Sequence, residues 1–221
     1  MTLFRAFADE EREPAVRGFL HEPEHGNGDG VVLTHGAGSN CQTRLLVELS
    51  NRLVASGWTV LRIDLPFRMA RKFGPPSPGG AGQDREGLKK AASLMRKRVA
   101  GRIFVGGHSY GGRQATMLLA KDPDVAEGLL LLSYPLHPPR KPQELRTKHF
   151  PELRSAALFV HGTRDPFATS EEMREALELI PGKHELIEIE GAGHELLPKT
   201  GGEEVLEEMV RELGRFAGKI A

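Results

Sequence analysis

Short apolar runs alternate along this chain with longer segments that carry apolar residues at helical spacing. Most of the runs are continuous rather than alternating with polar residues, as in strands of a parallel sheet that helices cover on both faces. The runs occupy residues 31–34, 59–63, 103–105, 129–132, 157–160 and 186–189, and the helical segments occupy 43–56, 84–99, 111–121, 169–179 and 203–217. This order predicts the α/β class with a doubly wound, mostly parallel sheet.

Three further segments lie outside this alternation. Residues 15–20, followed by the turn-rich segment 24–30, predict an antiparallel strand that leads through a hairpin into the first parallel strand. The Gly/Pro-rich segment 74–82 and the Pro-rich segment 134–150 each join neighbouring elements, so we interpret both as surface loops rather than linkers between domains. We therefore expect one domain over residues 1–221.

Charge and cysteine content narrow the class of protein. The 30 Lys and Arg residues equal the 30 Asp and Glu residues, so the chain has no overall attraction to nucleic acid or to an anionic membrane. A single cysteine, Cys41, excludes an internal disulfide framework. No apolar segment follows the charged N-terminus, and the longest aliphatic run is too short to span a membrane. We expect a cytoplasmic protein, whose oligomeric state the sequence does not determine.

The pentapeptide Gly-His-Ser-Tyr-Gly at 107–111 joins the predicted strand 103–105 to the predicted helix that follows it. A serine at such a turn has a strained backbone that exposes its hydroxyl, and the flanking glycines avoid clashes with the neighbouring strand and helix. The N-terminus of the helix then points at the oxyanion that forms during acyl transfer. Ser109 is therefore the candidate nucleophile, and the alternative is a Gly-rich turn with a capping serine.

A serine nucleophile needs a base, and the base needs a carboxylate to orient it. Asp165 follows the predicted strand 157–160, and His194 follows the strand 186–189 after a Gly-rich lead-in. Both residues fall at the edge of the sheet where Ser109 is exposed, in the order acid and then base. We assign Asp165 as the orienting acid and His194 as the base. The alternatives are a simple Asp-Pro turn and an incidental loop histidine.

Other histidines compete for the role of base. His108, next to the nucleophile, should point away from Ser109, and His184 would lie at the opposite end of its strand. His137 and His149 lie in the long Pro-rich loop and stay open as substrate contacts.

Acyl transfer also needs hydrogen-bond donors for the tetrahedral oxyanion. One should be the backbone N–H of Tyr110, the residue after the nucleophile, and the other should come from the loop after the first parallel strand. That loop reads His-Gly-Ala-Gly-Ser-Asn at 35–40, and we assign Ala37 as the second donor, with Gly38 as an option. The rival interpretation, a phosphate-binding loop, lacks both of the glycine patterns that such loops require.

Four motifs in this order resemble the α/β-hydrolase superfamily over nearly the whole chain. More narrowly, the chain looks like the small dienelactone-hydrolase-like branch, and in particular a group that includes an animal testis-expressed hydrolase-like protein and a subunit of the nonspecific-lethal (NSL) chromatin complex. The motifs are His-Gly-Ala-Gly at 35–38, Gly-His-Ser-Tyr-Gly at 107–111, Gly-Thr-Arg-Asp-Pro-Phe at 162–167 and Gly-Ala-Gly-His at 191–194; the narrower likeness rests on Gly-Gly-Arg at 111–113 and Tyr-Pro-Leu-His-Pro-Pro at 134–139.

The resemblance implies the α/β-hydrolase fold, with helices on both faces of the sheet, and a Ser-His-Asp triad, but no particular substrate. Many lipases and esterases insert a cap domain after the sixth strand. This chain has only the segment 134–150 at that place. We therefore expect that it has no large cap domain and that its site is open or shallow.

Together these features predict a serine hydrolase that cleaves a small ester, thioester or related acyl substrate through an acyl-enzyme, without a metal or organic cofactor. The alternative is a noncatalytic scaffold of the same fold that binds a protein partner. Nucleotide binding is disfavoured because a phosphate-loop lysine is missing. The two loops over the predicted site are basic. Their cations either are solvated surface charge or bind an anionic group of the substrate, and the sequence leaves both options open. The residues are Arg68, Arg71, Lys72, Arg140, Lys141, Arg146 and Lys148.

Overall fold

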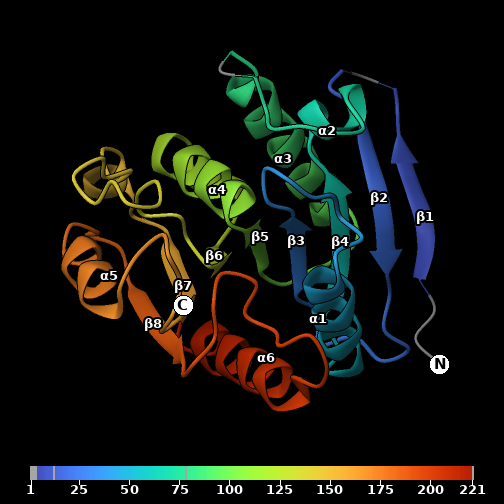
Figure 1. Ribbon diagram of the computed structural model, residues 1–221. Coiled ribbons are helices and arrows are strands. Elements are labelled where there is room, and N and C mark those ends of the chain that lie inside the picture. Colours follow the sequence, from blue (N-terminus) through green and yellow to red (C-terminus); the bar gives the residue numbers. More distant parts are fainter. Residues whose placement is uncertain (1–3, 12, 78, 221) are drawn as a thin grey trace.

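The computed structural model describes residues 4–11, 13–77 and 79–220, and the strands in that part of the chain form one eight-stranded sheet (Figure 1). The strand order across the sheet is β1-β2-β4-β3-β5-β6-β7-β8. The strands are β1 (Phe4–Asp9), β2 (Val16–His21), β3 (Gly30–Thr34), β4 (Thr59–Asp64), β5 (Ile103–His108), β6 (Gly128–Leu132), β7 (Ala156–Gly162) and β8 (His184–Ile189).

Six of these strands, from β4 to β8 across the sheet, run parallel to one another, and β2 and β1 are added antiparallel at one edge. The predicted mostly parallel sheet is therefore confirmed. All six predicted parallel strands are present, with boundaries that extend the predicted runs by only a few residues.

Helices cover both faces of the sheet. The helices α1 and α6 pack side by side on one face, whereas α3, α4 and α5 pack on the other (Figure 1). The helices are α1 (Arg44–Ala55), α2 (Pro66–Ala70), α3 (Ala81–Arg96), α4 (Tyr110–Lys121), α5 (Ser170–Leu177) and α6 (Glu203–Ala217).

Two apolar cores result from this layering. Along β3, Val32 belongs to the core under α3 and α4, whereas its neighbours Val31 and Leu33 belong to the core under α1 and α6. Because successive residues of a strand point to opposite faces, a strand buried on both sides must be apolar throughout. This explains the continuous apolar runs of the sequence.

The predicted N-terminal hairpin is wrong. The strand β2 pairs with β1 and with β4, while β3 lies between β4 and β5. The turn-rich segment before β3 is instead held by loops of the parallel sheet: the backbone N–H of Asn27 donates to the oxygen of Gly57, and that of Gly101 donates to the oxygen of Gly28, both at 2.8 Å. These bonds direct the chain past β4 rather than back along β2.

The edge strand β1 and the short helix α2 were not predicted, nor were two short 3₁₀ helices, Pro123–Val125 and Phe150–Glu152. The predicted loop 74–82 is also shorter than expected, because α3 already begins at Ala81; Pro78 of that loop lies outside the described residues.

In the part of the chain that the structure describes, no cap domain covers the carboxyl edge of the sheet. After β6 the chain passes through one irregular connection and a short 3₁₀ helix (Phe150–Glu152) before it enters β7. Among the described residues, none of the helices combines the length and the apolar character needed to cross a membrane. The carboxyl ends of β5, β7 and β8 meet at one edge, where the predicted site residues are carried.

Candidate active site

Ser109 occupies the turn between β5 and α4. Its φ of 51° and ψ of −114° form a conformation that residues other than glycine seldom adopt. A Cβ on Gly107 would lie 2.0 Å from the backbone oxygen of Thr34, and a Cβ on Gly111 would lie 2.6 Å from the Thr34 side chain. The strained turn, and the need for glycine on each side of it, agree with the expectation for residues 107–111.

His194 lies in the turn after β8, and its imidazole contacts both other members of the predicted triad. The hydroxyl oxygen of Ser109 lies 2.9 Å from Nε2, and Oδ2 of Asp165 lies 2.8 Å from Nδ1. An ionised carboxylate only accepts hydrogen bonds, so Nδ1 carries the proton and Nε2 accepts a hydrogen bond from the serine hydroxyl. This is the tautomer that a general base acting on the serine requires.

Asp165 is held on both carboxylate oxygens in the turn after β7. Its backbone N–H donates to the oxygen of Gly162 at 3.0 Å, and its Oδ1 accepts a 2.9 Å hydrogen bond from the backbone N–H of Phe167. The Asp165 side chain is fully buried, whereas 17% of the His194 side chain is exposed. A carboxylate fixed in this way can orient the imidazole and stabilise an imidazolium.

The turn that carries His194 packs directly against the end of β7. A Cβ on Gly162 would lie 2.4 Å from the backbone oxygen of Ala192, and that oxygen accepts a 2.9 Å hydrogen bond from the backbone N–H of Arg164. The ring of Phe167 lies against the imidazole of His194, with 4.2 Å between the ring centroids. Gly162 thus lets the acid and base turns approach closely, a role that the sequence analysis did not identify.

The two predicted oxyanion donors come from different elements, the first residue of α4 (Tyr110) and the loop after β3 (Ala37). That loop passes beside the nucleophile, since a Cβ on Gly36 would lie 3.5 Å from the Cβ of Ser109. Within the described part of the chain, the backbone N–H groups of Tyr110 and Ala37 donate no hydrogen bond. Two unoccupied donors beside the serine can bind a developing oxyanion.

The side chain of Tyr110 anchors the start of α4. Its hydroxyl donates a 2.7 Å hydrogen bond to Oδ2 of the buried Asp84 in α3. The other oxygen of Asp84 accepts a hydrogen bond from the backbone N–H of Phe67 at 3.0 Å. Burial and the Asp84 carboxylate raise the pKa of Tyr110, so its hydroxyl remains protonated and keeps donating. No pattern in the sequence indicates this link between α2, α3 and α4.

Arg68, in α2, organises the loop that carries Ala37. Its guanidinium donates to the backbone oxygens of Ser39 at 2.7 Å, Ala37 at 2.9 Å and Gly74 at 3.0 Å. Only 7% of Arg68 is exposed. Arg68 is one of the loop cations for which the sequence left an anionic substrate group open, but these carbonyl groups already occupy its donors. Arg68 therefore acts on the protein's own backbone.

Within the described part of the chain, His108 makes no hydrogen bond with Ser109, and its ring reaches the turn that carries the base. Its Nε2 donates a 2.8 Å hydrogen bond to the backbone oxygen of His194, and the two rings lie 4.9 Å apart. Burial, followed by the proximity of His194, lowers the pKa of His108. A neutral ring with its proton on Nε2 suits a donor to a carbonyl group.

The two loop histidines that were open as substrate contacts instead contact other side chains of the protein. Nε2 of His137 lies 3.4 Å from Oε2 of Glu172, and Nε2 of His149 lies 2.8 Å from the hydroxyl of Thr116. Both histidines therefore contribute to holding the connection between β6 and β7.

Four of the six remaining basic loop residues divide into two groups. Arg71 donates to the backbone oxygen of Pro75, and Lys141 forms a 2.7 Å ion pair with Glu144. Arg146 and Lys148, by contrast, line a cavity next to α4.

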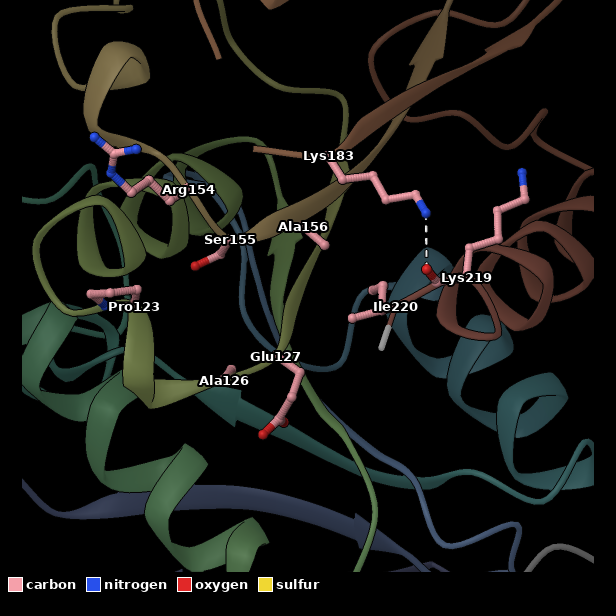
Figure 2. Close-up of a pocket in the computed structure, with 9 residues that line it drawn as sticks. All are labelled: Pro123, Ala126, Glu127, Arg154, Ser155, Ala156, Lys183, Lys219 and Ile220. Atoms are coloured by element: carbon pink, nitrogen blue, oxygen red, sulfur yellow. Dashed lines mark hydrogen bonds between the residues drawn. The ribbon is translucent and has the colours of Figure 1, made fainter. Parts of the chain in front are cut away.

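A second cavity, of about 410 Å³, lies at the opposite, amino edge of the sheet (Figure 2). Although basic residues line it, Figure 2 shows the charged ends of Arg154 and Lys219 pointing away from each other. The amino group of Lys183 donates to the backbone oxygen of Lys219 at 2.9 Å, and Glu127 accepts a hydrogen bond from the backbone of Ile103. These side chains do not converge on a common ligand position.

Comparison with known proteins places these features in a wider context. The model of a family described as an alpha/beta hydrolase domain matches residues 27–219. This range contains all of the predicted site residues.

The chain is 27% identical over 186 residues to a rat (Rattus norvegicus) protein named "Putative protein-lysine deacylase ABHD14B", a match that covers 81% of this chain and 84% of the relative. Among solved structures, dienelactone hydrolase from Anabaena variabilis is 18% identical with a TM-score of 0.74, covering 97% of this chain and 96% of that one. Est1E from Butyrivibrio proteoclasticus is 16% identical with a TM-score of 0.75, covering 97% and 99%.

Proposed function

The chain belongs to the alpha/beta hydrolase family and is a hydrolase, and from that premise we propose that it is a serine hydrolase that cleaves a small ester, thioester or related acyl substrate. We propose Ser109 as the nucleophile, His194 as the general base and Asp165 as the residue that orients the base. We also propose that residues 1–221 form one domain, which the single sheet and the family match over 27–219 support.

One observation carries this proposal. The hydroxyl of Ser109, the imidazole of His194 and the carboxylate of Asp165 form a continuous chain of hydrogen bonds of 2.9 and 2.8 Å. The three residues come from three separate turns at the same edge of the sheet. A buried carboxylate, a correctly protonated imidazole and a strained, partly exposed serine together meet the geometric requirements for nucleophilic acyl transfer.

In the first half of the proposed reaction, the oxygen of Ser109 attacks the carbonyl carbon of the substrate while Nε2 of His194 takes the hydroxyl proton. The buried Asp165 stabilises the resulting imidazolium. The carbonyl oxygen becomes an oxyanion, which accepts hydrogen bonds from the backbone N–H groups of Tyr110 and Ala37. His194 then donates its proton to the leaving group as the carbon–leaving-group bond breaks, which leaves an acyl group on Ser109.

In the second half, water takes the place of the leaving group. Nε2 of His194 removes a proton from the water as its oxygen attacks the acyl carbon, and the same two N–H groups bind the second oxyanion. The bond to Ser109 breaks, its oxygen recovers the proton from His194, and a carboxylic acid is released. No other group is required to balance protons or electrons.

Two features bear on the range of substrates. The connection after β6 contains no cap domain, which supports access by substrates that do not need an enclosed pocket. The rat relative is named for the removal of acyl groups from lysine, which is acyl transfer from nitrogen rather than from oxygen or sulfur. A substrate panel for this chain should therefore include an N-acyl-lysine peptide beside esters and thioesters.

The direct test is hydrolysis of such a panel by the wild type and by Ser109→Ala. We expect at least one class to be hydrolysed, with the Ala variant lowering kcat by about 10³-fold or more while the fold remains intact, because triad members act as a unit. Unchanged turnover in Ser109→Ala would overturn the assignment of the nucleophile.

The alternative is a noncatalytic scaffold of the same fold that binds a protein partner. Such a scaffold has no need for a serine of raised nucleophilicity. It would leave the whole panel unhydrolysed and would form no acyl-enzyme, so rapid quenching followed by mass spectrometry of the intact protein separates the two functions.

A further inference from the structure

A cavity of about 380 Å³ lies between α4 and the irregular connection from β6 to β7. In Figure 1 the green helix α4 lies next to this yellow connection. Three cationic side chains line the cavity, Arg113 from the helix and Arg146 and Lys148 from the connection. Met117 and Leu145 give the lining an apolar part.

These cations lack carboxylate partners. Among the described residues, no Asp or Glu oxygen lies within 4.0 Å of the charged groups of Arg113, Arg146 or Lys148, although Glu152 also lines the cavity. The Nε atom of Arg113 is buried and makes no hydrogen bond within the described chain. The side chain of Arg146 uses one nitrogen to donate to the backbone oxygen of Pro135 at 3.2 Å. Most of its donors stay available.

The positive charges also act on one another. Burial and then the charge of Arg113 lower the pKa of Arg146. Burial, followed by the charges of Arg113 and Arg85, lowers the pKa of the adjacent His149 to about 4, so this histidine is uncharged at neutral pH. Like charges gathered beside a guanidinium whose buried Nε makes no hydrogen bond are unfavourable unless an anion enters between them.

One residue that lines the cavity, Arg113, belongs to the first turn of the helix that follows the proposed nucleophile. Arg113 is four residues after Ser109, and its backbone N–H donates a 3.0 Å hydrogen bond to the backbone carbonyl oxygen of Ser109. Four residues of an α-helix advance by only about 6 Å along the helix axis. Long side chains in a helix lean toward its N-terminus, which for α4 is the end that carries Ser109. A group bound by Arg113 is therefore within reach of a small molecule whose carbonyl carbon lies at Ser109.

We propose that Arg113, Arg146 and Lys148 form a subsite for an anionic group of the substrate, a carboxylate or a phosphate. This proposal rests on the proposed hydrolase function, since it names the class of acyl substrate that the site takes. The guanidinium of Arg113 binds the anionic oxygens, Arg146 and Lys148 add charge from the other wall, and Met117 and Leu145 contact the aliphatic part between the anionic group and the scissile bond.

The kinetic test compares 4-nitrophenyl butyrate with mono-4-nitrophenyl glutarate, which differ chiefly in a terminal carboxylate. We expect the wild type to prefer the glutarate ester in kcat/KM, mainly through KM, and the preference to shrink as salt is added. Arg113→Gln should reduce the ratio of the two kcat/KM values by about tenfold or more, because a charge-assisted bond is lost. Arg154→Gln, which removes an arginine at the amino edge of the sheet, is the matched control and should leave the ratio unchanged. An equal ratio in wild type and Arg113→Gln would overturn the subsite.

A binding test separates this subsite from the catalytic proposal. Calorimetry on Ser109→Ala should detect glutarate or inorganic phosphate, and the signal should disappear in Ser109→Ala/Arg113→Gln. Binding of one anion alone identifies which group the substrate carries. If the wild type hydrolyses no member of the substrate panel, these two esters included, but the anion binds through Arg113, the hydrolase proposal fails and the anion site stands. If neither anion binds at millimolar concentration, the subsite is refuted whatever the enzyme hydrolyses.

Discussion

The imidazole Nε2 of His108 donates a 2.8 Å hydrogen bond to the backbone oxygen of His194, a residue 86 positions further along the chain. The residue that precedes the proposed nucleophile thus holds the turn that carries the proposed base. His108 is the last residue of β5, a buried strand in the centre of the sheet. This bond therefore fixes the position of the His194 imidazole relative to the buried centre of the fold. His108 is a positioning residue in this account.

Replacing His108 should therefore affect catalysis more than substrate binding. For His108→Leu, which removes the donor, we expect kcat to fall by about tenfold with KM changed much less, because the imidazole of His194 is less well held. His108→Gln keeps a side-chain donor and should recover part of the loss. Steady-state kinetics of both variants on one ester give this comparison. Equal kcat in all three proteins would contradict the positioning role.

The guanidinium of Arg68 should be needed to keep the Ala37 N–H in place. Arg68→Met retains much of the buried stem but removes the donors to the oxygens of Ala37 and Ser39. We expect kcat to fall by about 10- to 100-fold, approaching the loss of an oxyanion donor, with a smaller change in KM. Arg71→Met, in which an exposed arginine of the same segment is replaced, serves as the control. The account of the oxyanion loop is refuted if the two variants have the same kcat.

A methyl group at Gly162 should disturb the active site through the backbone. Its Cβ would lie 2.4 Å from the oxygen of Ala192, so the turn that carries His194 must move. We expect Gly162→Ala to lower the free energy of unfolding by about 1–3 kcal/mol and to lower kcat as well. Gly214→Ala, in α6, is the control because a Cβ there meets no atom within 4 Å. Urea denaturation and kinetics on both variants check the prediction; a Gly162→Ala protein as stable and active as the control would contradict it.

The partly buried His149 should make the protein less stable in acid. Its pKa falls from 6.5 to about 4 on folding. Between these values the unfolded chain binds a proton that the folded chain does not, so stability decreases as the pH falls from about 6.5 to about 4. In urea denaturation at several pH values, the wild type should lose stability more steeply over this interval than His149→Gln. Parallel curves for the two proteins would rule out this contribution.

The elements that sequence patterns predicted are those whose signal is local. The parallel strands are apolar on both faces, and the helix α6 carries a stripe from Leu206 to Phe216, so their periodicity identified them. The edge strand β1 was missed because it pairs with β2 alone and one of its phenylalanines, Phe4, is half exposed. The helix α2 has five residues and depends on Asp84, which accepts a hydrogen bond from the Phe67 N–H.

The candidate site likewise contains residues with a local signal in the sequence and residues without one. Ser109, Asp165 and His194 each lie in the turn that follows a parallel strand. Because the carboxyl ends of parallel strands meet at one edge of the sheet, their order along the chain was enough to predict that they come together. Arg68, Gly162 and the Asp84–Tyr110 pair act through contacts between loops and helices that are distant in the sequence. No local pattern predicts such contacts. For His108 one signal was available, its position at the end of the central strand beside the nucleophile.

The most direct measurement of the central claim is covalent labelling with a fluorophosphonate probe, read out by peptide mass spectrometry. If His194 activates Ser109, one probe molecule should be bound per chain, on the peptide that contains Ser109, and His194→Ala should suppress the labelling while remaining folded by circular dichroism. A folded wild type that takes up no probe, or is labelled at another residue, would contradict the account.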